Sequence, residues 1–457
     1  MLRRARIALL LSVFSAALLA PRPGLGQEAT LEDRPAPDSV EGLHGALSGA
    51  LEEPEPERTA FPWLKRKLRD LPPFLRDTEI RVKPRTYYFD RSNGDDPRAR
   101  AWALGGSLTY ASGYFEDVFA IGGALYTTQR LIGKDSEDGT LLLKEGQQGF
   151  TVLGQAYAVL KLRDHHATLY RQQLDLPYVN KQDSRMVPNT FEGYTATGQF
   201  WDVWKLEKLE YIGGYLDRIK LRDRDEFIGM SKAAGVPGSS KGMFFGGARI
   251  TPWDGFTLGG LDYFVDDTLN TAYAEVDYTR KLTEALALRL GGQFTHQSSA
   301  GSNDLTGSSF ATWVLGGQIA ASYKGFILRT AFSTVDDRER IRSPFGSYPG
   351  YLAMMQSDFR RAGEDAWLVG ASYDFRRFGL PGLSFFTNFA QGTGRRDPST
   401  GAPLPDRRSF DVTVDYQRNE GPLRGFWLRV RASLLDTDGQ QNRTDVRVIL
   451  NYSVPVL

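Results

Sequence analysis

The sequence predicts an all-β protein: a transmembrane antiparallel up-and-down β-barrel of about 18 strands with inward-folded constriction loops. Three observations predict this class. The chain begins like an exported protein, its apolar and polar residues alternate with a period of two from residue 77 to 457, and short and long connections take turns. A soluble sandwich would show the same alternation, so the export signal and the connection lengths favour the membrane barrel.

The N-terminal residues have the three parts of a secretory signal peptide. Arg3, Arg4 and Arg6 precede an apolar run over 7–20, and Gly24 and Gly26 are small residues suited to a cleavage site. We expect domains at 1–26 (signal peptide), 27–76 (acidic, Pro-rich tail and linker, partly disordered) and 77–457 (barrel). Within the linker, 61–75 mixes apolar and basic residues, and either an interfacial helix or a plain linker fits it.

Composition narrows the function. Lys and Arg number 56 and Asp and Glu number 55, so no bulk charge attracts nucleic acid. Cysteine is absent and histidine occurs four times, which leaves little for thiolate, metal or triad chemistry. We therefore expect no cofactor, no metal and no enzymatic activity.

The alternating segments are separated by clusters of Gly, Pro, Asp and Asn, as strands are. We expect strands at 78–90, 100–111, 116–128, 149–163, 166–173, 192–200, 204–219, 241–251, 255–266, 270–281, 284–296, 309–322, 326–334, 364–376, 382–391, 406–418, 424–435 and 443–454. Long connections fall at about 129–148, 174–191, 220–240 and 335–363.

One face of each segment is apolar and the other polar. In 426–435, Phe426, Leu428 and Val430 oppose Arg429 and Arg431. In 150–163, the alternation assigns Phe150, Val152, Ala156, Leu160 and Leu162 to the lipid and Gln155, Tyr157, Lys161 and Arg163 to the lumen.

Basic residues recur on the expected lumen faces at both ends of the barrel sequence. In a closed barrel the first and last strands are neighbours, so these bases would converge on one wall and attract anions. Alternatively, each base pairs with a nearby acid and is structural. The candidate pore residues are Arg81, Lys83, Arg85, Lys161, Arg163, Arg407, Arg429, Arg431 and Arg447.

Two long stretches, 175–194 and 343–367, interrupt the strand pattern. The first is bracketed by Pro and contains Asp183 and Arg185, and the second is rich in Gly, Pro and aromatic residues. Long loops without secondary structure are uncommon unless they are functional or disordered, and the apolar content argues against disorder. Both suit constriction loops.

Several motifs carry a resemblance to a known family. "RTYYFDR" (85–91), "DSRMVPNTFEG" (183–193), "SPFGSYPGY" (343–351) and "SDFRRAGEDAWLVGASYDF" (357–375) followed by "GLPGLSFFTNFAQG" resemble the OprD family of outer-membrane porins. The resemblance implies eighteen-stranded channels that admit small carboxylate-bearing solutes, such as amino acids and organic or aromatic acids, by passive and selective diffusion.

The same resemblance implies a basic ladder and two inward loops. Carried onto this sequence, the ladder is Arg81, Arg85, Arg163, Arg407, Arg429 and Arg431, and the loops are 175–194 and 343–363. Tyr178, Asp183, Arg185, Ser347 and Tyr348 are the loop candidates, and the facing of Arg171 is ambiguous.

The expected partners follow from the interpretation of the chain as an outer-membrane porin. They are small anionic or zwitterionic solutes, the lipid and lipopolysaccharide of a Gram-negative outer membrane, the barrel assembly machinery and, as one assembly, a homotrimer. An outer-membrane hydrolase of the lipase or phospholipase type is the alternative, with His296 as its candidate base.

Overall fold

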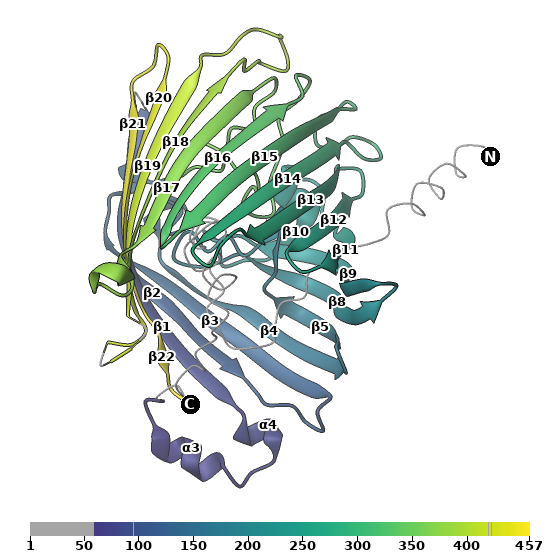
Figure 1. Ribbon diagram of the computed structural model, residues 1–457, viewed down its shortest axis with the longest axis vertical. Helices are drawn as coiled ribbons and strands as arrows, with labels where there is room; N and C mark the ends of the chain where they lie inside the picture. Colours follow the sequence, from purple (N-terminus) through teal and green to yellow (C-terminus); the bar gives the residue numbers. More distant parts are fainter. Residues whose placement is uncertain (1–58, 95, 419, 422) are drawn as a thin grey trace, which may run out of the picture.

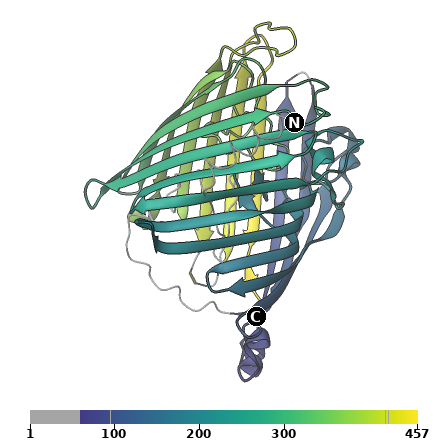
Figure 2. The ribbon, with the colours of Figure 1, turned by 90° about the vertical axis from the view of Figure 1, so that its right-hand side faces the viewer.

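The computed structural model describes residues 59–94, 96–418, 420–421 and 423–457. The expected signal peptide and nearly all of the acidic tail lie outside these ranges. The described part forms one closed antiparallel barrel, drawn in Figure 1 and, turned by 90°, in Figure 2.

The barrel wall consists of 18 strands, which confirms the expected fold class. They are β1 (Glu79–Asn93), β2 (Asp96–Ala111), β3 (Phe119–Ile132), β4 (Phe150–Leu162), β5 (His165–Gln172), β8 (Thr190–Val203), β9 (Leu206–Lys220), β11 (Met243–Trp253), β12 (Phe256–Val265), β13 (Leu269–Lys281), β14 (Leu286–Ser298), β15 (Ala311–Tyr323), β16 (Phe326–Val335), β17 (Asp365–Asp374), β18 (Leu383–Thr393), β19 (Arg407–Arg418), β20 (Phe426–Thr437) and β21 (Arg443–Tyr452).

The remaining elements are short. They are β6 (Asp175–Leu176), β7 (Val179–Asn180), β10 (Ile228–Gly229), β22 (Val454–Pro455), α3 (Pro62–Leu68), α4 (Pro73–Arg76), α5 (Met230–Ala234) and the 3-10 turns η1 (Asp135–Glu137), η2 (Glu145–Gln147) and η3 (Phe375–Phe378). Among the described residues, no helix has the length and apolar character needed to cross a membrane.

The ring closes where the first strand meets the last. β1 pairs with β2 on one side and with β21 on the other, from Arg85 opposite Asn451 to Ser92 opposite Thr444. The short β22 continues the same edge against Arg81 and Val82. Closure leaves no unpaired sheet edge, so the backbone groups within the wall are satisfied by neighbouring strands.

Period-two alternation sets which side chains face the lipid. On β1, Val82 is 37% exposed on the outer surface, whereas Tyr87 and Phe89 are buried inside the barrel. Large apolar side chains such as Leu104, Phe332 and Val446 form the exposed outer band that would be unfavourable in water and is favourable in lipid.

The expected facing of β4 is wrong at its start. Phe150 and Val152 are buried inside, while Leu153 and Leu160 are exposed outside. The cause is a bulge: Ala124 of β3 pairs with Gln155 and the next residue, Leu125, pairs with Leu153, which leaves Gly154 as an extra residue. One extra residue exchanges the two faces of a strand.

Long and short connections alternate around the ring as expected. The long ones are 133–149, 173–189, 221–242 and 336–364, and they lie at one end. Exposed aromatic residues cluster beside the short turns at the other end: Phe115, Trp201, Trp204, Trp253, Phe326 and Phe378. Such a girdle is typical of the membrane–water interface, and short turns are typical of the periplasmic end.

Candidate functional site

Two long loops enter the lumen and contact the wall. In the loop 173–189, Tyr178 Oη lies 2.8 Å from Thr295 Oγ1 of β14, and Asp183 accepts hydrogen bonds from Arg85 of β1. In the loop 336–364, Met355 N donates to Asp411 of β19 (2.8 Å) and Gln356 Nε2 donates to Ser433 of β20. The loops therefore reach different strands and narrow the pore between them.

The two loops are joined by Asn180. Its Oδ1 accepts from the backbone N of Ser347 (2.8 Å) and its Nδ2 donates to the Ser347 carbonyl (3.2 Å). Gly346 allows this approach, because a Cβ there would lie 2.5 Å from Asn180 Oδ1. Tyr178 and Tyr348 pack edge to face beside the joint, with ring centroids 5.9 Å apart.

The tyrosines of the joint are buried and neutral. Burial raises the pKa of the Tyr178 and Tyr348 phenols above the ordinary value. Neither phenol contributes negative charge to the pore at neutral pH.

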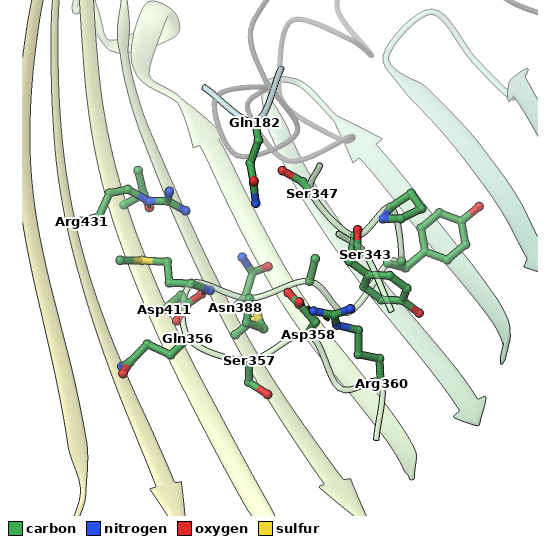
Figure 3. Close-up of a pocket in the computed structure, with 18 of the residues that line it drawn as sticks. Gln182, Ser343, Ser347, Gln356, Ser357, Asp358, Arg360, Asn388, Asp411 and Arg431 are labelled. Atoms are coloured by element: carbon green, nitrogen blue, oxygen red, sulfur yellow. Dashed lines mark hydrogen bonds and ion pairs between the residues drawn. The ribbon is translucent and has the colours of Figure 1, made fainter. Parts of the chain in front are cut away.

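A cavity of about 360 Å³ lies between the loops and the wall (Figure 3). Arg431 reaches it from the wall, while Ser343, Ser347, Asp358 and Arg360 approach from the loop 336–364 on the opposite side. Gln182 comes from the other loop, and Asn388 of β18 and Asp411 of β19 belong to the wall.

Arginine is the predominant charged residue in the lining of this cavity. Among the residues that the structure describes, its lining contains seven arginines and two carboxylates. The arginines are Arg91, Arg185, Arg222, Arg329, Arg360, Arg429 and Arg431, and the carboxylates are those of Asp358 and Asp411. Guanidinium groups donate several hydrogen bonds in a fixed fork, which matches a carboxylate.

The wall formed by β19, β20, β21 and β1 carries these bases in adjacent rows. Arg431 lies opposite Thr413 on one side and Arg447 on the other, and Arg447 lies opposite Phe89 of β1. In the next row, Asp445 lies opposite Arg91. The expected convergence of first and last strands thus places bases from three strands beside one another.

Several of these bases are held by buried carboxylates. Asp445 is fully buried and accepts from both Arg91 (2.6 and 2.9 Å) and Arg447 (2.9 and 3.1 Å).

Two further buried pairs follow the same pattern. Arg429 makes a two-bond pair with Asp415 (2.6 and 2.7 Å), and Arg407 makes one with Glu364 (2.6 and 2.8 Å). Some arginines of this wall therefore form ion pairs with buried carboxylates, and arginines also line the pore cavity.

Phe89 supports three guanidinium groups. Its ring centroid lies 5.0 Å from the Cζ of Arg91, 5.0 Å from that of Arg185 and 5.1 Å from that of Arg447. The ring is fully buried, so this contact orients the three groups without exposing an apolar surface to the pore.

Three further candidate pore residues lie on the inward face of β1. Arg81, Lys83 and Arg85 alternate with the outward Val82 and Pro84 on β1; Arg81 donates to Ser453 and Arg85 to Asp183 and Asn451.

Lys161 and Arg163 lie away from the basic wall. Lys161 pairs with Asp117 (2.7 Å) at the short-turn end. Arg163 lies in the turn after β4 with φ at 54°, so its expected place inside a strand is wrong. Arg171, whose facing was ambiguous, pairs with Glu192 and stacks on Phe227.

The loop candidates lie at the constriction. Arg185 is buried and donates to the carbonyls of Thr140 and Ser184, while Ser347 and Tyr348 line the cavity with it.

Sequence reasoning missed several lining residues. Arg91 and Arg329 continue the inward parity of their strands, so the alternation could have identified them. Arg222 and Arg360 lie in loops, where no periodicity marks the direction of a side chain. Asn180, which joins the two loops without belonging to the cavity lining, lies in the two-residue β7 and was missed for the same reason. Among the described residues, no group of three or more His, Asp or Glu is arranged to hold a metal ion.

Residues 72–456 match the family model described as outer membrane porin, OprD family. The chain belongs to the OprD family. This places it in the outer membrane of a Gram-negative bacterium.

Two curated relatives are porins. Over 417 residues the chain is 22% identical to Porin D of Pseudomonas aeruginosa, covering 84% of this chain and 92% of the relative. Over 404 residues it is 24% identical to the porin-like protein GalP of Pseudomonas putida, covering 84% and 93%.

Solved structures show the same fold. Pseudomonas aeruginosa OccK9 (OpdG) superposes with a TM-score of 0.75 at 22% identity, covering 84% of this OprD-family chain and all of that one. Pseudomonas aeruginosa OpdK, solved with vanillate, superposes with a TM-score of 0.74 at 20% identity and the same coverage. Family and fold point to a channel, and no comparison supports the alternative hydrolase.

Proposed function

We propose that this OprD-family porin gives passive, selective passage to small carboxylate-bearing solutes, including amino acids and organic or aromatic acids. The observation that supports this most directly is the lining of the constriction cavity, with seven arginines against two carboxylates. A solute carboxylate entering from either side meets guanidinium forks on the wall and on both loops.

The cavity has the size of a binding site for a small solute. About 360 Å³ lies at the low end of the range of about 300–1,000 Å³ for small-molecule sites. The relative OpdK was solved with vanillate, which is itself a small carboxylate, and this agrees with the proposal without fixing the solute of this chain.

The two acids add a second recognition element. Asp411 and Asp358 lie in the same cavity as the arginines, so a zwitterion could present its ammonium group to a carboxylate while its own carboxylate binds arginine (Figure 3). Conduction requires that this binding be weak enough for release. The arginines provide several successive partners instead of one deep site.

The test compares each carboxylate with its neutral amide of nearly equal size. Purified porin in liposomes is assayed for the uptake of glutamate against glutamine and of benzoate against benzamide. The reversal potential in a KCl gradient gives ion selectivity. We expect each carboxylate to permeate faster than its amide, and Arg431→Gln to reduce that preference about fivefold, because one charge at about 4 Å is worth about 1 kcal/mol in water.

A matched control is Arg377→Gln, an exposed arginine in the turn after β17. It removes the same charge far from the cavity and should leave the preference unchanged. Equal uptake of acids and amides by the unmodified porin would contradict the proposal. Delivery by the barrel assembly machinery and a homotrimeric state stay predictions.

A further inference from the structure

The segment 59–77, called here the N-terminal arm, lies beyond the short-turn end of the barrel (Figures 1 and 2). It contains α3 and α4. The match to the family model begins at residue 72, so α3 precedes the part of the chain that the family accounts for. Its role must be argued from its own residues.

The arm is fixed to the barrel at two places. Phe74 accepts a hydrogen bond from the backbone N of Gly113 (3.0 Å), and its ring packs edge to face on Phe115, with centroids 6.5 Å apart. At the other place, Ala60 N donates to the Pro455 carbonyl (2.8 Å). Both contacts are with residues at the short-turn end.

These contacts set the level of the arm relative to the bilayer. Phe115 is 54% exposed and belongs to the aromatic girdle beside the short turns. Such girdles lie at the membrane–water interface, here on the periplasmic side. The arm therefore leaves the barrel at the height of the lipid headgroups.

The surface of the arm combines exposed apolar side chains with positive charge. Phe61, Trp63, Leu71 and Leu75 are all between 39% and 50% exposed, and no residue of α3 is buried. The rings of Phe61 and Trp63 lie 6.4 Å apart. In water this is a costly arrangement for a segment of 19 residues.

The arm carries more basic than acidic residues. Lys65, Arg66, Lys67 and Arg69 follow one another around α3, against Asp70 alone. The remaining base, Arg76, pairs with Asp77 (2.8 Å). Aromatic and leucine side chains beside unmatched Lys and Arg are the composition of helices that lie in the interface of an anionic membrane.

We propose that the N-terminal arm lies on the periplasmic leaflet of the outer membrane and binds anionic phospholipid. Phe61 and Trp63 enter the boundary between headgroups and acyl chains, and the bases of α3 contact phosphate. Lys67 Nζ lies 5.4 Å from the Trp63 ring, as expected for a base that extends along an aromatic anchor toward the headgroups. This proposal does not depend on which solute the pore carries.

The absence of cysteine in the chain makes the test direct, because one introduced cysteine is a unique labelling site. Leu71→Cys in the arm and Ser399→Cys in an exposed outer loop are each labelled with a polarity-sensitive fluorophore. The full-length porin is reconstituted into phosphatidylcholine vesicles with or without phosphatidylglycerol. Some of the lipids carry bromine on their acyl chains as a quencher.

We expect the label at position 71 to shift to shorter wavelength and to be quenched, more strongly when phosphatidylglycerol is present. The label at position 399 should report water throughout. Replacing Lys65, Arg66 and Lys67 together with Glu should release the arm, since each base near an anionic surface contributes about fivefold to the binding equilibrium. Heat-modifiable mobility verifies that each variant barrel is assembled.

Three outcomes overturn the proposal. One is a label at position 71 that reports water in both kinds of vesicle, and another is quenching that phosphatidylglycerol does not strengthen. The third is a shift that appears only when soluble peptidoglycan fragments are added, which would assign the arm to the cell wall.

Discussion

Asn180 and Ser347 join the two constriction loops through a pair of hydrogen bonds at 2.8 and 3.2 Å. The residues are 167 positions apart in the sequence and lie on loops that extend from different strands. Both loops also contact the wall and Ser347 lines the cavity, so we expect this pair to limit the width of the cavity.

The Asn180→Ala variant should widen and loosen the constriction. Each lost hydrogen bond is worth about 1 kcal/mol, so the joint should open part of the time while the barrel stays assembled. We expect larger single-channel conductance and more frequent current fluctuations in planar bilayers. Asn442→Ala, at an exposed site in the β20–β21 loop, is the control, and an identical conductance for both variants would show that the joint does not limit the pore.

Arg429 and Arg431 should differ in stability more than in selectivity. Arg429 and Asp415 form a buried pair, and removing one partner of such a pair costs about 3–5 kcal/mol. Arg431 is more exposed and donates to the neutral Thr413 hydroxyl (3.2 Å). We therefore expect Arg429→Gln to lower the temperature of heat-modifiable migration clearly more than Arg431→Gln does.

Both substitutions remove one positive charge from the cavity lining, so both should lower anion preference in the reversal potential. A larger loss of stability in Arg431→Gln than in Arg429→Gln would contradict this ordering.

Asp445→Asn should make the pore more anion-selective and the barrel less stable. The carboxylate neutralises Arg91 and Arg447 at a fully buried position, so its loss leaves excess positive charge and costs about 3 kcal/mol. The reversal potential and unfolding in urea measure the two effects.

The control for Asp445→Asn is Asp438→Asn, which removes an exposed carboxylate paired with Arg408 at 2.9 Å. Exposed pairs contribute about 0–1 kcal/mol, so little should change. An equal loss of stability in the two variants would show that the ion pairs of Asp445 with Arg91 and Arg447 do not stabilise the barrel.

The contacts of Asp267 with Lys241 and Ser302, called here the Asp267 clasp, should hold three outer loops together down to low pH. Asp267 in the loop after β12 pairs with Lys241 and accepts from the backbone N of Ser302 (2.8 Å), and these contacts lower its pKa from 3.8 to about 2. A lowered folded pKa gives stabilisation that is present above the unfolded value and is lost as the pH falls through about 2.

Digestion with pepsin tests this clasp. Cleavage within 299–310 should stay slow down to about pH 3 and rise as pH 2 is approached, whereas Asp267→Asn should be cleaved throughout. Asp304→Asn in the same loop is the control. Slow cleavage of Asp267→Asn would show that the carboxylate does not hold the loops together.

The strands were predictable because alternation with a period of two is a local property that lipid on one side and water on the other enforce. All 18 expected segments overlap the observed strands. The bulge at Gly154 was not predictable, since one inserted residue leaves no pattern in a single sequence. The position of Arg163 was not predictable either, because at a strand end a shift of one residue moves a side chain from the barrel wall into a turn.

The site was predictable only in part. The inward parity of Arg85, Arg429 and Arg431 follows from their strands, and Arg91 could have been added by the same rule. Asn180, Arg222 and Arg360 could not, because their positions depend on how two loops fold against a wall built from distant strands. Which bases are neutralised by buried acids is likewise a property of the closed ring.

The seam where β1 meets β21 runs through the basic wall, and Asp445 and Arg91 face each other across it. During synthesis or membrane insertion, β1 is therefore present long before β19, β20 and β21, which form the rest of that wall. Closing the ring and completing its ion pairs are the same event. A chain that ends before β21 should therefore leave the ring open and leave Arg91 without its carboxylate partner, so the pore and its basic wall are completed only by the last strand.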